Sequence, residues 1–301
     1  MTEGNITQPD PTLEVPSHSK SDLRSNIEPP SDQVANRREV AVAGYRLETC
    51  RFGSLDAPLR VVLLHEGLGS VAAWRQFPAR LARQIGEPVL AYSRAGYGHS
   101  SALTEARAPG FMHHEAQVVL PALLQALAIE RPILIGHSDG ASIALIYAGT
   151  CNGSGTRAKA NVAGPPPLGV AVMAPHLFVE DVTVEEIGKV DAAFQASGLA
   201  ARLGRYHRDP VATFHGWAGV WLSAPFRQWT IEAEVAAIRC PLLAIQGHDD
   251  QYGSARQIES IARLLPHAGT LMLADCRHSP HQEQPVAVLA ALTGFIAGLP
   301  C

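Results

Sequence analysis

The stretch Pro132–Leu145 constrains the fold of this chain most strongly, because it reads as a buried strand, a tight turn and a helix. The apolar run before the turn is too short for a buried helix and is typical of a strand. The turn is Gly136-x-Ser138-x-Gly140, the pattern of a nucleophile elbow. A serine at such a corner points out of the sheet, and the backbone N–H that follows it faces the same space, where it could hold an oxyanion.

The composition is that of one large α/β domain that could carry an inserted subdomain. Of the 301 residues, 47% are hydrophobic and 17% are charged, which is enough for a sizeable core. The formal net charge of −4 gives no reason to expect nucleic acid or an anionic membrane surface as a partner. No apolar run approaches the roughly 18–20 residues of a membrane span. The stretch that starts with Met1–Asn5 lacks the basic and then apolar segment of a secretory signal, so a cytoplasmic location is expected. The five cysteines are scattered without a C-x-x-C pair, which argues against a disulfide framework and against a zinc site.

The chain divides into a tail, a core in two parts and a cap. Residues 1–36 are rich in proline and polar residues, and we expect them to form a disordered N-terminal tail. Strands alternate with helices over 37–175 and again over 240–301, which predicts a mainly parallel central sheet with helices on both faces. Functional residues should collect at the carboxyl ends of these strands. Between 176 and 239 the alternation stops, and we interpret this segment as a helical cap.

Several elements have recognisable ends in the sequence. Ala43-Gly44 is expected to turn a hairpin, and Ser70 to cap a helix that stops at Gly86. A helix from about Phe111 to Ala128 should kink or break at Pro121. Thr183-Val184-Glu185-Glu186 has the form of a capping box and predicts a helix start inside the cap. Residues 150–167 are expected to form a flexible surface loop.

Two later motifs accompany the elbow, and they carry a resemblance. They are Gly247-His248-Asp249-Asp250 and Cys276-Arg277-His278-Ser279-Pro280-His281-Gln282-Glu283-Gln284-Pro285. From about residue 38 to its end, the chain resembles the α/β-hydrolase superfamily, in its cap-bearing branch of esterases, C–C hydrolases and related enzymes. The family places its serine, acid and histidine in this order, which implies the α/β-hydrolase fold with Ser138, Asp250 and His278 as the catalytic residues. Asp249 is the rival acid, but the family's acid commonly stands three residues after the glycine, which favours Asp250.

The implied roles follow from the chemistry of the side chains. Ser138 is a poor nucleophile at its own pKa and needs a base, His278, which Asp250 would orient and stabilise as the imidazolium. The oxyanion hole implied by the resemblance consists of the backbone N–H groups of Asp139 and Gly67, with Leu68 as a weaker candidate for the second donor.

The chain departs from the commoner family pattern at Glu66, Ser93 and Asp139. Glu66 stands where glycine is usual, and Ser93 replaces the usual aspartate before Arg94. Asp139 is either a helix-start carboxylate favoured by the helix dipole or a contact for a polar or cationic substrate group. The candidate substrate-binding residues are Glu66, Leu68, Trp217 and Trp221. The cap aromatics either line a pocket or only seat the cap on the core.

The function expected first is that of a cofactor-independent serine hydrolase that cleaves a small carboxylic ester, lactone or thioester through an acyl-enzyme. The alternatives are a C–C bond hydrolase, lyase or perhydrolase with the same triad, and a ligand-binding homologue without useful turnover. The pairs His113-His114 and His278-x-x-His281 lack a third ligand at metal spacing, and Gly96-x-Gly98 lacks the third glycine of a dinucleotide fingerprint. We therefore expect no metal and no cofactor, a small-molecule substrate as the partner, and a monomer or homodimer.

Overall fold

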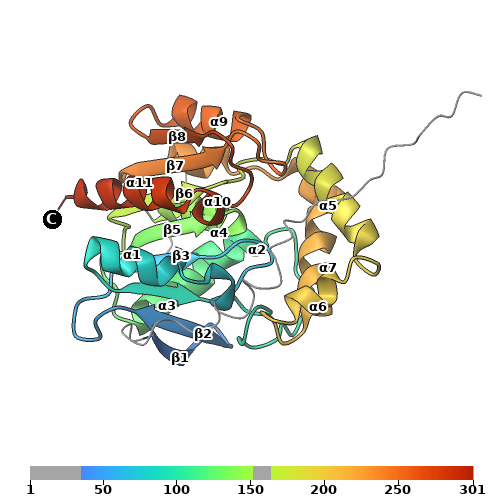
Figure 1. Cartoon of the computed structure of the whole chain (residues 1–301), viewed down its shortest axis with the longest axis horizontal. Helices are drawn as coiled ribbons and strands as arrows, with labels where there is room; N and C mark the ends of the chain where they lie inside the picture. Colours follow the sequence, from blue (N-terminus) through green and yellow to red (C-terminus); the bar gives the residue numbers. More distant parts are fainter. Residues whose placement is uncertain (1–34, 152–163, 301) are drawn as a thin grey trace, which may run out of the picture.

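The computed structural model describes residues 35–151 and 164–300 and contains one eight-stranded sheet with helices on both faces (Figure 1). The strand order is β1-β2-β4-β3-β5-β6-β7-β8. Strands β3 to β8 run parallel, while β2 is antiparallel to both β1 and β4. The predicted α/β-hydrolase architecture is therefore confirmed. The expected tail lies outside the described residues as far as residue 34, whereas Ala35 and Asn36 already belong to β1.

The elements follow the predicted alternation. The strands are β1 (Ala35–Val42), β2 (Tyr45–Phe52), β3 (Val61–Leu64), β4 (Val89–Tyr92), β5 (Ile133–His137), β6 (Gly169–Met173), β7 (Leu242–Gly247) and β8 (Gly269–Leu273). The core helices are η1 (Ala72–Trp74), α1 (Phe77–Ile85), α2 (Phe111–His114), η2 (Glu115–Val119), α3 (Leu120–Ala126), α4 (Asp139–Thr150), α9 (Arg256–Leu264), α10 (Pro280–Glu283) and α11 (Pro285–Ala297). Between β6 and β7 lie α5 (Asp181–Ala193), α6 (Leu199–Leu203), α7 (Pro210–Trp221), η3 (Ala224–Gln228) and α8 (Glu232–Ala236).

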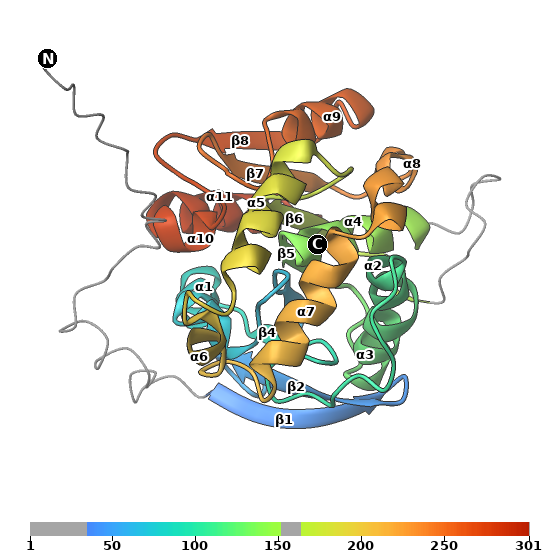
Figure 2. The same ribbon diagram turned by 90° about the vertical axis from the view of Figure 1, so that its right-hand side faces the viewer.

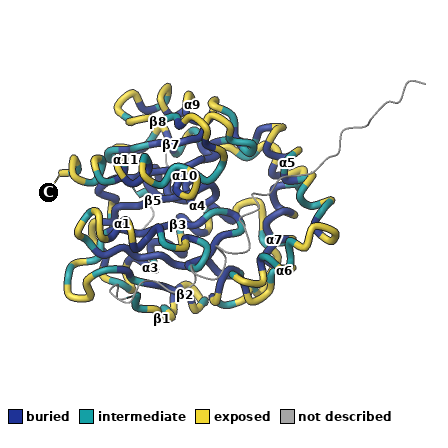
Figure 3. Tube along the Cα trace, viewed as in Figure 1, coloured by how far each residue is buried: buried dark blue, intermediate teal, exposed yellow. Residues whose placement is uncertain are grey.

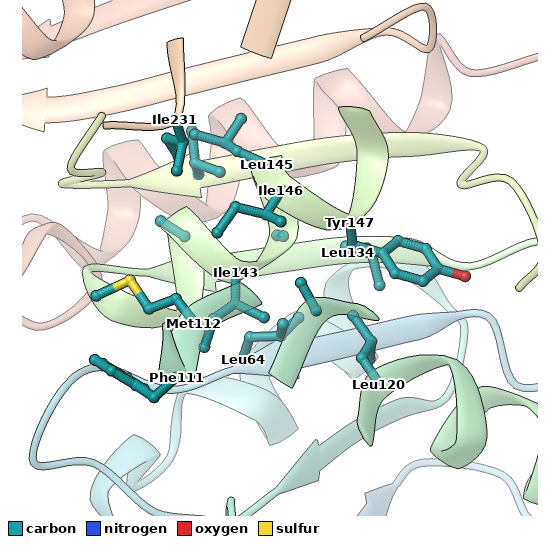
Figure 4. Close-up of a cluster of buried hydrophobic side chains, with 14 of the residues drawn as sticks. Leu64, Phe111, Met112, Leu120, Leu134, Ile143, Leu145, Ile146, Tyr147 and Ile231 are labelled. Atoms are coloured by element: carbon teal, nitrogen blue, oxygen red, sulfur yellow. The ribbon is translucent and has the colours of Figure 1, made fainter. Parts of the chain in front are cut away.

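The sheet separates two apolar cores because successive strand residues point to opposite faces. In β5, Leu134 joins the core under α2, α3 and α4, while Ile133 and Ile135 join the core under α1 and α11. Figure 4 shows Leu134 next to Tyr147 in the first of these cores, which also contains Met112 and Ile143. The buried trace runs through the middle of the molecule, and exposed segments lie at its rim (Figure 3). Both faces are covered, which explains why the central strands are apolar throughout.

The predicted hairpin at Ala43–Gly44 is confirmed. Two expectations about helix ends, one at Ser70 and one at Thr183, need correction. Ser70 precedes the short helix η1, and its hydroxyl accepts from Ala73 N at 3.3 Å. This helix does not continue to Gly86, because Arg75 has a positive φ of 53° and separates η1 from α1, which does end at Gly86. The break expected at Pro121 is present: the π-helical segment η2 ends just before it and separates α2 from α3, and proline has no backbone N–H to continue an α-helical pattern. Thr183 lies inside α5, which begins at Asp181, and its hydroxyl donates to Tyr252 O instead of capping the helix.

The cap lies across the carboxyl-terminal edge of the sheet. Figure 2 views the molecule from the cap side, with α5 and α7 in front of the strands. One face of α7 contacts two core loops and the start of α4. The contacting residues are Thr213, Trp217 and Trp221, which recur every fourth position. Thr213 donates to Gly96 O at 2.9 Å, and the Trp221 indole donates to Asp139. No helix among the described residues is long and apolar enough to span a membrane.

Candidate active site

Ser138 occupies a sharp corner between β5 and α4. Its φ of 52° and ψ of −119° are unusual for a residue with a side chain, and such strain is found at functional sites. The turn leaves no room for a side chain at Gly136 or Gly140. A β-carbon at Gly136 would lie 2.4 Å from Gly140 O, and one at Gly140 would lie 2.1 Å from Leu64 O. The G-x-S-x-G pattern is therefore a packing requirement of this turn.

A continuous chain of hydrogen bonds runs from Ser138 through His278 to Asp250. Ser138 Oγ lies 3.0 Å from His278 Nε2, and His278 Nδ1 lies 2.8 Å from Asp250 Oδ1. The Asp250 carboxylate also accepts from Tyr252 N at 2.9 Å and from the Gln246 amide at 3.2 Å. Burial alone would raise the pKa of Asp250, but the facing His278 imidazole and these hydrogen bonds lower it below its ordinary value. The site therefore holds an ionised acid, an imidazole and a hydroxyl in line.

The second acid of the motif does not take part in this chain. Asp249 is exposed, and its backbone N–H donates to Cys276 O at 2.9 Å. The structure thus brings Asp250, and not Asp249, to the imidazole.

The loop that carries His278 is held by a residue that the sequence did not single out. Glu283, in the first turn of α10, accepts from Arg277 N at 2.8 Å and from Ser279 N at 2.9 Å. Its carboxylate is therefore hydrogen-bonded to the backbone on both sides of His278. The only sequence signal is its place in the first turn of a helix that starts at Pro280, where a carboxylate satisfies free N–H groups.

The two predicted oxyanion donors lie on neighbouring segments. Leu64 pairs with Gly136 in the sheet, so the loop 65–70 leaves β3 beside the elbow. Asp139 opens α4, and the N–H of a first helical residue has no partner within its own helix. Trp217 of α7 covers the loop at Gly67, where a β-carbon would lie 2.1 Å from the indole Nε1. The half-buried Leu68 is tied to the cap because its carbonyl accepts from His207 Nε2 at 2.9 Å.

Asp139 is a buried carboxyl whose partners come from the cap and the core. Its Oδ1 accepts from Trp221 Nε1 at 3.2 Å, and its Oδ2 lies 4.0 Å from Arg94 Nη2. Burial raises the pKa of Asp139, and the Arg94 guanidinium only partly opposes this. Trp221 is fully buried by this contact, so the structure places it as a link between cap and elbow.

The departure at Ser93 is compensated by a carboxylate from another strand. Glu48 of β2 accepts from Ser93 Oγ at 2.8 Å and from His99 N at 3.0 Å. The negative charge expected at position 93 is thus supplied from position 48. Arg94 then donates to the carbonyls of His65 and Glu66, which holds the loop 65–70 in place.

The Glu66 side chain faces His137, with Oε2 3.6 Å from Nδ1. Whether Glu66 or Leu68 contacts a substrate stays a prediction. Of the other histidines, His113 pairs with Glu234, and His281 packs against the Trp74 ring at 4.8 Å. Within residues 35–151 and 164–300, no group of three or more His, Cys, Asp or Glu side chains could hold a metal ion.

Comparison with known proteins agrees with this architecture. A model of the alpha/beta hydrolase family matches residues 61–292. The 2-succinyl-6-hydroxy-2,4-cyclohexadiene-1-carboxylate synthase of Serratia proteamaculans (strain 568) is 26% identical over 261 residues, which cover 81% of this chain and 95% of that protein.

Solved structures share the fold at lower identity. The 2-hydroxy-6-oxo-6-phenylhexa-2,4-dienoate hydrolase of Rhodococcus sp. strain RHA1 superposes with a TM-score of 0.73 at 16% identity, over 88% of this chain and 100% of that one. The enol-lactonase of Burkholderia xenovorans LB400 gives a TM-score of 0.66 at 20% identity, over 86% of this chain and 100% of that one.

Proposed function

The chain belongs to the alpha/beta hydrolase family, and from this premise we propose that it is a cofactor-independent serine hydrolase of small carboxylic esters, lactones or thioesters. The proposal assigns Ser138 as nucleophile, His278 as general base and Asp250 as the acid that orients it. One observation carries it: a serine in a strained corner lies 3.0 Å from an imidazole that is itself 2.8 Å from a buried carboxylate.

In the first half of the proposed reaction, Ser138 Oγ attacks the carbonyl carbon while its proton passes to His278 Nε2. Asp250 stabilises the imidazolium that forms at this moment. The carbonyl oxygen becomes an oxyanion, which the N–H groups of Asp139 and Gly67 would hold. When the tetrahedral species collapses, His278 returns the proton to the leaving alcohol or thiol, and the acyl group remains on Ser138.

In the second half a water molecule attacks the acyl-enzyme. His278 Nε2 takes the proton of this water, and the same two N–H groups would hold the second oxyanion. Collapse releases the carboxylic acid and returns the proton to Ser138 Oγ, so that the enzyme is regenerated. The half-buried Leu68 and the Trp217 ring are the proposed walls of the acyl site.

A second candidate, cleavage of a C–C bond or a lyase reaction with the same residues, rests on the comparisons. The Serratia relative is a synthase of a cyclohexadiene carboxylate, and the Rhodococcus neighbour is a hydrolase of a dienoate. Glu66, in place of the usual glycine, would belong to this chemistry if it touched the substrate.

The test is turnover of a short p-nitrophenyl ester. We expect a burst of p-nitrophenol followed by steady turnover, and a loss of at least about 10³-fold in kcat for Ser138→Ala. Ser197→Ala, at an exposed cap serine, is the matched control and should behave like wild type. Turnover of a dienoic keto acid without turnover of esters would favour the second candidate. Tight ligand binding without any product would favour a non-catalytic homologue.

A further inference from the structure

Glu66 and His137 are an acid and a base that the proposed catalytic steps leave unused. Glu66 immediately precedes Gly67 in the loop after β3, and His137 immediately precedes Ser138 at the end of β5. Their side chains form an ion pair with 3.6 Å between Oε2 and Nδ1. The His137 side chain is only 2% exposed, so this pair is shielded from bulk water on the imidazole side.

The second nitrogen of His137 reaches the loop of the proposed base. His137 Nε2 donates to the backbone carbonyl of His278 at 2.7 Å. A carbonyl oxygen only accepts hydrogen bonds, so His137 Nε2 carries a proton. Nδ1 makes no hydrogen bond among the described residues, and the Glu66 carboxylate that faces it at 3.6 Å favours a second proton on it. Burial would lower the pKa of His137, but the Glu66 carboxylate and the His278 carbonyl raise it overall. Burial would raise the pKa of Glu66, but His137 lowers it below its ordinary value.

The described residues around Glu66 and His137 leave space for the carboxylate and place no competing cation beside the imidazole. A β-carbon at Gly69 would lie 2.3 Å from Glu66 Oε2, so glycine at that position leaves the space that the carboxylate fills. His281 packs edge-on against His137 at 4.8 Å, and burial lowers its pKa well below the ordinary value, so it stays neutral. The remaining titratable groups near His137 are the proposed triad members His278 and Asp250.

We infer that Glu66 and His137 form an ionised clamp that ties the oxyanion loop to the His278 loop, and that Glu66 acts as a positioning residue. This inference rests on the proposed function. One end of the clamp is one residue from the Gly67 donor, and the other end is the carbonyl of His278 itself. A change in the clamp therefore changes the distance between the group that holds the oxyanion and the group that moves the proton.

Such a change affects the transition state more than the binding of substrate. We expect Glu66→Gln, which keeps the shape but removes the charge, to lower kcat for a p-nitrophenyl ester about 10–100-fold with KM within about twofold. His137→Gln should cause a similar loss, and the double variant should be no slower than the slower single variant, because both remove one linkage.

The matched control is an ion pair at the other end of β3. Arg60 precedes β3, Glu87 precedes β4, and their side chains are joined at 2.6 Å with partial exposure. Glu87→Gln should leave kcat unchanged. An unchanged kcat in Glu66→Gln, or losses that multiply in the double variant, would overturn the clamp.

A measurement on the wild-type protein tests the inference even if the variants fold poorly. In ¹⁵N spectra of histidine-labelled wild type recorded over a pH series, one imidazole should keep both protons to a higher pH than an ordinary histidine, and Glu66→Gln should remove this difference. A wild type in which no imidazole keeps both protons to a higher pH than an ordinary histidine would overturn the clamp even if the proposed function holds. Absence of ester turnover and of Ser138 labelling by a fluorophosphonate in wild type would instead contradict the proposed function itself.

Discussion

At the scale of single residues, the choice between two adjacent carboxylates decides how the proposed base is oriented. Asp250 accepts from His278 Nδ1 at 2.8 Å and is held by Tyr252 N and Gln246, whereas Asp249 is exposed. A buried carboxylate with three donors around it keeps its charge, because each hydrogen bond favours the ionised form. These contacts assign the two residues different tasks although they share one motif.

We predict that Asp250→Asn lowers kcat for ester hydrolysis by about 10²–10⁴-fold, because the amide can no longer stabilise the imidazolium or select its tautomer. Asp249→Asn is the matched control, since it makes the same chemical change one residue away, and its kcat should stay within about twofold of wild type. Steady-state kinetics on both variants, with their Tm values measured in parallel, checks this. Equal losses in the two variants would contradict the assignment of the acid.

At the scale of elements, the cap helix α7 packs against the loop after β3 at one glycine, Gly67. Gly67 has an ordinary backbone conformation, and the ring of Trp217 occupies the place of its missing side chain. On the same face of α7, Thr213 donates to the loop at Gly96, and Trp221 donates to Asp139 at the start of α4.

Gly67→Ala should therefore lower kcat/KM about 10–100-fold, because the new methyl group pushes α7 and the oxyanion loop apart. Gly216→Ala, in α7 itself, meets no atom within 4 Å and should keep its activity while gaining slightly in stability. Combining Gly67→Ala with Trp217→Phe should restore part of the loss, since the smaller ring makes room. Ester kinetics with no recovery in the double variant would show that the steric argument is wrong.

The strands could be predicted to within a few residues, whereas helix ends and the supports of the site could not. Apolar runs between turn residues mark strands directly. Ser70 does accept from the backbone N–H of Ala73, but Arg75 ends that helix after one turn. The Thr183 hydroxyl binds a carbonyl 69 residues away instead of capping a helix. Glu48 and Glu283 leave little signal, because each acts on backbone N–H groups that only the fold brings near.

At the scale of the whole molecule, the sheet brings together residues that are far apart in the chain. The loops after β3, β5, β7 and β8 carry Gly67, Ser138, Asp250 and His278 to one edge, and the cap covers that edge (Figure 2). The order of the residues could be predicted from the family resemblance. Their distances depend on the parallel register of the sheet and on how the cap seats upon it.

The most direct test of the central claim is where, and how fast, a fluorophosphonate modifies the folded protein, followed by intact and peptide mass spectrometry. The account predicts one adduct, on Ser138, with a rate that falls by at least about 10³-fold in His278→Ala because the hydroxyl then has no base. An adduct on another residue, or an equal rate of Ser138 modification in His278→Ala and wild type, would contradict it.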